Sequence, residues 1–188
     1  EKSPDAVESP CDVFRSQGGG CGGCKSLGMS YEAQIREKQS QVDKVFATWA
    51  SENRTVVHPI IAAIASDRLQ HRNRVDFSFS ARRYLPPAEG GSAFGGTIIE
   101  AQEPSRATGG GGSSGVLQSM FVGLRPAGIS DAVIDVETCL LPSPSASAIY
   151  ADIRQWFVET EEGRRIRAWD HQAKEGFLRE LTVRSGGG

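Results

Sequence analysis

An alternation of apolar and polar side chains with a period of two runs from Asn73 to Tyr84. Val75, Phe77, Phe79 and Ala81 are separated from one another by single polar or charged residues. Because successive side chains of a strand point to opposite faces, this pattern predicts a β-strand with one face buried. Such a strand is stable only when it pairs with others, so the chain is expected to form a sheet.

Other segments show the helical period. Apolar residues recur at steps of three, four and seven between residues 30 and 50, which predicts an amphipathic helix with Ser30 as its N-cap. Residues 146–161 predict a second helix. Shorter strand patterns occupy residues 120–124, 133–136 and 177–184. Helices alternating with strand pairs favour an α+β fold, in which helices flank an antiparallel sheet beside a Cys-rich loop.

Glycine is concentrated in a few places. Of the 22 glycines in 188 residues, nine lie between residues 85 and 119, a composition typical of a mobile linker. We therefore predict a Cys-rich loop at 1–28, a helix at 29–58 and an α+β central domain at 59–188, with a Gly/Ser-rich insertion at 85–119.

The chain has 21 basic and 23 acidic residues, which excludes a uniformly basic surface. It contains no long apolar run or secretory leader pattern, so we expect no membrane contact and an intracellular location.

The four cysteines define the candidate site. Cys21 and Cys24 are separated by two glycines in a turn, and Cys11 and Cys139 are the others. In such a turn both thiolates can reach one group, and freed backbone N–H groups can donate hydrogen bonds to sulfur. Four thiolates suit a structural zinc ion or an iron–sulfur cluster, while a redox dithiol, a disulfide or free thiols are the alternatives. None of the three histidines has a second histidine at metal-binding spacing, so none is predicted as a ligand.

An ordered series of motifs across nearly the whole chain resembles the RNA 5-methyluridine methyltransferases. The series is Cys11…Cys21-Gly-Gly-Cys24, Tyr31-x-x-Gln34, Lys38-x-x-x-Val42-x-x-x-Phe46, Arg72-Asn73-Arg74-Val75-x-Phe77-Ser78-Phe79, Gly123-Leu124-Arg125, Asp135-Val136-x-x-Cys139-x-Leu141 and Gly176-Phe177-Leu178-Arg179-x-Leu181-x-Val183-Arg184. Each motif is weak alone, and the order makes the set specific. The gap between Cys11 and Cys21 is longer than is usual in that family.

The resemblance implies the fold of the family's central domain and a 4Fe–4S cluster held by Cys11, Cys21, Cys24 and Cys139. Family members methylate C5 of a uridine in tRNA or rRNA with S-adenosylmethionine. Their cysteine nucleophile, general base and donor site lie on a following domain, for which this sequence shows no counterpart. We therefore expect no catalytic residue and no methyl transfer by this chain alone. S-adenosylmethionine would act only in a full-length enzyme, with the missing donor-binding domain supplied in cis.

RNA contact is the activity expected of the chain itself. Arginines Arg72, Arg74 and Arg82 lie on the polar side of the predicted strand, and Arg125 follows Gly123-Leu124. Arginines beside aromatic rings are typical of single-stranded RNA sites. Phe77 and Phe79, however, share the apolar face and are predicted as core residues. The alternative function is a non-catalytic RNA-binding or assembly module stabilised by zinc or an iron–sulfur cluster.

Overall fold

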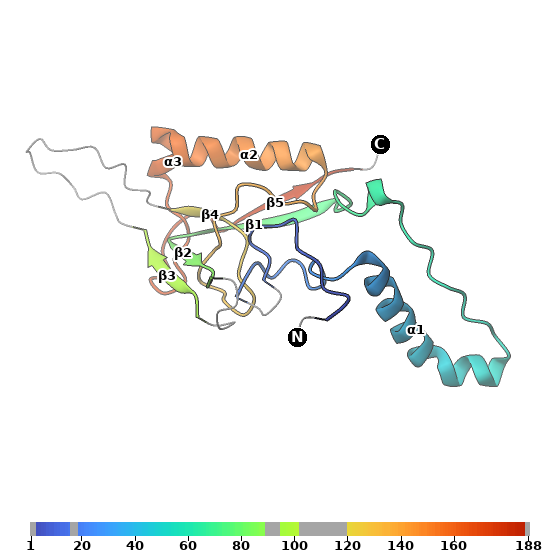
Figure 1. The fold of residues 1–188 in the computed structure, drawn as a ribbon. Helices are drawn as coiled ribbons and strands as arrows, with labels where there is room; N and C mark the ends of the chain where they lie inside the picture. The colour runs from blue at the N-terminus through green and yellow to red at the C-terminus, as the bar shows by residue number, and fades with distance from the viewer. Residues whose placement is uncertain (1–2, 16–18, 89–94, 102–119, 187–188) are drawn as a thin grey trace, which may run out of the picture.

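The computed structural model describes residues 3–15, 19–88, 95–101 and 120–186 (Figure 1). Its centre is a three-stranded antiparallel sheet in the order β4–β1–β5. A second antiparallel pair, β2–β3, lies beyond the end of β1. The strands are β1 (Arg74–Ser80), β2 (Arg82–Leu85), β3 (Thr97–Glu100), β4 (Phe121–Gly123) and β5 (Glu180–Arg184). Antiparallel sheets with helices beside them confirm the predicted combination of α and β structure.

Helix α2 (Pro144–Glu159) covers the apolar face of the three-stranded sheet and forms the core with it (Figure 1). The Phe77 ring of β1 stacks on Tyr150 with ring centroids 3.7 Å apart, and Phe79 meets Phe157 edge-on at 4.9 Å. Phe77 and Phe79 are buried, so the prediction that both are core residues is confirmed. Ser143 caps the helix by accepting a hydrogen bond from the Ala146 N–H. The short helix α3 (Glu161–Arg165) follows α2 directly.

Helix α1 (Tyr31–Asn53) projects away from the sheet (Figure 1). Its start agrees with the sequence pattern, because the Ser30 hydroxyl accepts a hydrogen bond from the Ala33 N–H at 3.3 Å. It ends at Arg54, whose φ of 51° lies in the left-handed region. An extended segment and the short helix η1 (Ala65–Asp67) then return the chain to β1. No helix in the described part of the chain is long and apolar enough to cross a membrane.

Three strand predictions needed correction. The pattern at 73–84 is divided at Ala81, because the Ser80 hydroxyl accepts a hydrogen bond from the Arg82 N–H and donates one to the Asp131 carbonyl. Residues 133–136 do not form a strand: Val133 bridges to Arg83 and Ile134 to Leu124, so the partner changes at each residue. The last strand begins only at Glu180 rather than at residue 177.

The stretch at 85–119, predicted as an insertion, contains strand β3. All four of its residues are exposed, and it pairs only with β2 among the described residues. The Gly109–Gly112 run lies outside the described residues. Glycine content did not predict the strand β3 within this stretch.

Candidate functional site

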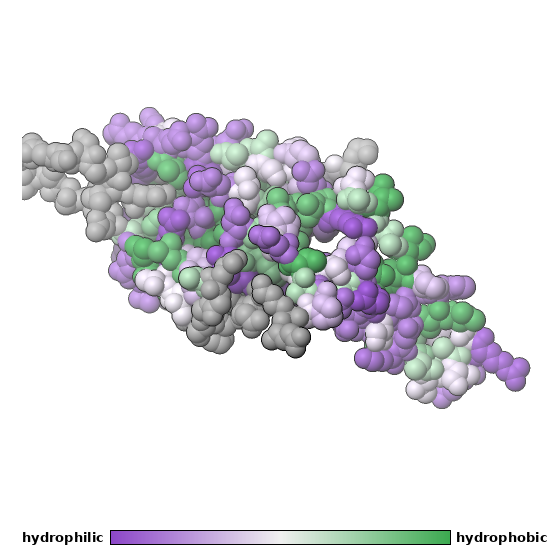
Figure 2. Space-filling view, viewed as in Figure 1, coloured by the Kyte–Doolittle hydropathy of each residue, from purple (hydrophilic) through white to green (hydrophobic). Residues whose placement is uncertain are grey.

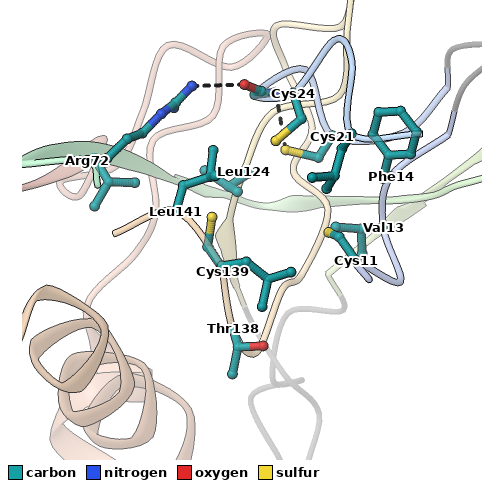
Figure 3. Close-up of a pocket in the computed structure, with 14 residues that line it drawn as sticks. Cys11, Val13, Phe14, Cys21, Cys24, Arg72, Leu124, Thr138, Cys139 and Leu141 are labelled. Atoms are coloured by element: carbon teal, nitrogen blue, oxygen red, sulfur yellow. Dashed lines mark hydrogen bonds between the residues drawn. The ribbon is translucent and has the colours of Figure 1, made fainter. Parts of the chain in front are cut away.

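Three separate segments bring the four cysteines to one cavity (Figure 3). Cys11 comes from the N-terminal segment, Cys21 and Cys24 from the glycine turn, and Cys139 from the loop before α2. Figure 3 shows their sulfur atoms directed toward a shared space. Apolar side chains, among them Phe14, Leu124 and Leu141, complete the lining. All four cysteines belong to the described residues, and all carry free thiols.

Backbone hydrogen bonds hold these segments in place. The Cys21 N–H donates to the Val13 carbonyl at 3.0 Å, and the Gly22 N–H donates to the Arg125 carbonyl at 3.1 Å. On the other side, the Arg72 N–H donates to the Leu141 carbonyl at 2.9 Å, which positions the loop that carries Cys139. The cavity is thus built against the end of the sheet where β1 begins and β4 ends, rather than by the Cys-rich segment alone.

The glycine turn behaves as its sequence predicts. The Gly23 N–H donates a hydrogen bond to the Cys21 sulfur at 3.4 Å. Gly20, just before the turn, has no room for a side chain, since a Cβ there would lie 2.5 Å from the Val13 carbonyl oxygen. Glycine is required at this position because two backbone segments approach each other closely.

The electrostatics of the turn do not favour a redox dithiol. Burial raises the pKa of the Cys21 thiol, a shift reduced by the Gly23 N–H and increased by the other three thiols. Burial also raises the pKa of Cys24, although Arg72 opposes this effect. A redox-active Cys-x-x-Cys needs a lowered pKa at a helix start, whereas α1 begins only at Tyr31.

The metal-binding prediction stays a prediction. The donor set, four free thiols around one apolar cavity, suits a thiolate-bound group. Among the described residues, however, no three His, Cys, Asp or Glu side chains form a group that could hold a metal ion.

Three of the four predicted RNA-contacting arginines are exposed. Arg74 is the first residue of β1, Arg72 lies just before it, and Arg125 follows β4. The Arg72 guanidinium donates to the Gly23 carbonyl at 2.9 Å, and Arg125 Nε donates to the Ser78 hydroxyl at 3.0 Å. Arg74 pairs with Asp76 at 3.1 Å. Arg72 and Arg125 thus border the cysteine turn, a link that no sequence spacing indicated because Arg72 and Gly23 are 49 residues apart.

Arg82 lies in a different environment. Its side chain is buried, and its guanidinium pairs with Asp131 at 3.1 Å and Glu100 at 3.3 Å. The kink at Ala81 turns Arg82 away from the polar face on which the alternating pattern placed it. These ion pairs link β2 to β3 and to the loop at Asp131.

The known proteins that are similar to this chain belong to one class, the RNA methyltransferases. No family profile matches the chain. It is 31% identical over 98% of its length to an uncharacterized RNA methyltransferase of Chlorobaculum tepidum, of which it covers 32%. It is 27% identical over 96% of its length to another from Porphyromonas gingivalis, covering 35% of that protein. The chain is thus homologous to part of proteins named RNA methyltransferases.

One relative has a more specific name. The chain is 24% identical over 99% of its length to a tRNA (uracil(54)-C(5))-methyltransferase of Pyrococcus horikoshii, and covers 32% of it. The chain therefore spans about a third of the length of the curated relatives it matches. The similarity to RNA methyltransferases extends over nearly all of this chain and over a minor part of each relative.

Proposed function

We propose that this chain is the cluster-bearing, RNA-contacting region of an S-adenosylmethionine-dependent RNA uridine-C5 methyltransferase. The observation that carries the proposal is the convergence of Cys11, Cys21, Cys24 and Cys139 on one cavity. These residues come from segments up to 128 positions apart, so local sequence does not account for their meeting. The similarity to RNA methyltransferases supports the reaction class, and the Pyrococcus relative supports uridine C5 as the target.

Four thiols are the ligand set of either a 4Fe–4S cluster or a structural zinc ion. We propose the cluster, because the ordered motifs that include Cys11, Cys21, Cys24 and Cys139 resemble those of cluster-bearing RNA 5-methyluridine methyltransferases. The hydrogen bond that the Gly23 N–H donates to the Cys21 sulfur is the kind of contact that stabilises a cluster ligand. When bound, such a cluster would join the N-terminal segment to the loop before α2.

The RNA surface proposed here consists of Arg72, Arg74 and Arg125, which we call the arginine surface. Residues 74, 76 and 78 of β1 share the face opposite α2, and Arg125 reaches this face through Ser78. Exposed guanidinium groups bind phosphate oxygens and release condensed counterions. The local concentration of arginine makes RNA contact compatible with a net charge of −2 for the whole chain.

Anaerobic purification followed by iron, sulfide and zinc analysis tests the cluster. We expect about four iron and four sulfide per chain. Cys139→Ser should lose the cluster, whereas Thr138→Ser, a neighbouring change that keeps the hydroxyl, should retain it. Stoichiometric zinc without iron would support the non-catalytic, zinc-stabilised alternative. Metal-free protein would contradict both.

The same preparation tests the arginine surface with single-stranded, uridine-containing RNA at several salt concentrations. Replacing Arg72 and Arg74 by Gln should reduce the slope of log K against log salt by about 1.4, since each phosphate contact on a single strand contributes about 0.7. Arg165→Gln, which removes an exposed arginine on α3, is the control and should leave the slope unchanged. Equal slopes for wild type and the double variant would remove the assignment.

A further inference from the structure

Helix α1 and the extended segment after it form an arm, residues 31–64, that carries apolar side chains outside the core. Ala33 is the buried residue of the helix. Val45 is 76% exposed, Trp49 is 52% exposed, and Ile61 on the returning segment is 95% exposed. Figure 1 shows the arm projecting from the sheet, and Figure 2 shows apolar residues among polar ones on its surface.

The apolar residues of the helix are arranged as a docking face. Val42, Val45, Phe46 and Trp49 recur at steps of three and four, so they occupy a stripe about 100° wide along the second half of α1. We call these four residues the arm stripe. The Phe46 and Trp49 rings meet edge-on with centroids 6.3 Å apart, and both remain about half exposed. A stripe of this width is what a core-facing helix normally buries.

The base of the arm is fixed, while the stripe lies toward its far end. The Ala63 N–H donates to the Tyr31 hydroxyl at 2.7 Å, and the Ile60 N–H donates to the Gln39 side chain at 2.7 Å. The Arg68 guanidinium lies 3.8 Å from the centre of the Tyr31 ring. These contacts hold the first half of α1 and the returning segment, so the arm stripe is presented in a defined direction.

The composition of the helix indicates a protein partner rather than RNA. Residues 31–53 contain four carboxylates and three basic side chains, so the helix offers no positive field for phosphate. An exposed apolar stripe on a helix marks a protein contact, because most helical stability in proteins comes from packing an apolar face. The arm stripe therefore needs an apolar protein surface.

We propose that the arm stripe docks on the part of an RNA methyltransferase polypeptide that lies outside the third covered by this chain. The Chlorobaculum relative aligns over 98% of this chain, arm included, and has about three times its length. The remaining two thirds of such a protein are the surface available to cover the stripe. This proposal rests on the sequence similarity, and it depends on neither the cluster nor RNA binding.

Hydrogen exchange tests the docking directly. Exchange is measured on this chain and on the full-length Chlorobaculum protein, for the helix that aligns with residues 42–53 and for the strand that aligns with β1. We expect at least tenfold slower exchange of the helix amides in the full-length protein, with similar protection of the strand in both. Equal exchange of the helix in the two proteins would overturn the proposal.

A charge placed in the stripe separates docking from a general effect on the helix. Glu at the position aligned with Val45 should lower the melting temperature of the full-length relative, and Glu at the position aligned with Ser51, on the opposite side of α1, should not. In this chain alone both Val45→Glu and Ser51→Glu should leave the melting temperature unchanged. A concentration-dependent dimer of this chain that Val45→Glu abolishes would assign the stripe to a second copy and overturn the proposal.

Discussion

The sheet with α2 and the arm with α1 both place apolar residues on a helix face at helical spacing, but only the first buries them. In α2, Tyr150 and Phe157 pack on Phe77 and Phe79 and are almost fully buried. In α1, Phe46 and Trp49 have the same kind of spacing and remain about half exposed. Periodicity therefore predicts a helix and its apolar face, and a packing partner within the chain decides whether that face contributes to the core.

The two regions also serve different parts of the proposed function. The sheet carries the segments that place Cys139 and Arg72 around the cysteine cavity, so the site depends on the core. The arm leaves the Cys-rich segment directly after Ser30, and its far end lies away from the cavity (Figure 1). We expect changes in the arm stripe to affect docking and changes in the core to affect folding.

The largest expected difference comes from truncating the same residue type in the two regions. Phe77→Ala removes a ring that is 1% exposed, so the free energy of unfolding should fall by about 3–5 kcal/mol. Phe46→Ala removes a ring that is 46% exposed, and the change should stay within about 0.5 kcal/mol. Urea unfolding followed by circular dichroism measures both. Similar losses for the two variants would show that the arm is part of the same cooperative core.

Removing the N-cap of each helix should give a smaller difference in stability between the two regions. Ser30 and Ser143 each accept a hydrogen bond at 3.3 Å from the backbone N–H three residues later. Ser143→Ala should lower the free energy of global unfolding by about 1 kcal/mol, because α2 packs on the sheet. Ser30→Ala should increase hydrogen exchange in the first turn of α1 and leave global unfolding unchanged. An equal loss of global stability in both variants would contradict this separation.

Local sequence patterns predicted helix starts and core residues. The surroundings of individual side chains depend on contacts between residues far apart in sequence, which these patterns do not contain. Ser30 as N-cap and Phe77 as a core residue followed from capping chemistry and alternation. Arg82 did not, because its burial depends on Asp131 and Glu100, which lie far from it in sequence. The cysteine pair was visible from its spacing, but the position of Arg72 beside Gly23 depends on tertiary structure. A period of two identifies a strand face without saying whether the chain kinks within it.

The smallest expected effect is a pH dependence of stability that comes from a side-chain contact between β1 and β5. The arm contains no paired strands and so has no equivalent contact. The hydrogen bond from the Thr182 hydroxyl, at 2.7 Å, lowers the pKa of the Asp76 carboxyl, and Arg74 lowers it further. A lowered pKa in the folded state stabilises the protein above the unfolded value of about 3.9. That contribution is lost as the pH falls through the folded pKa. Because the Asp76 side chain is 35% exposed, solvent screening keeps the effect small.

Replacing Thr182 tests this contribution against a close control. Thr182→Val removes the hydroxyl, so stability should decline less between about pH 5 and pH 2 than in the wild type. Thr182→Ser keeps the hydroxyl and should retain the wild-type pH dependence. Urea unfolding at several pH values measures both, and Phe46→Ala in the arm should again follow the wild type. If Thr182→Val and Thr182→Ser gave identical pH profiles, the acid dependence of stability would originate outside the β1–β5 pair.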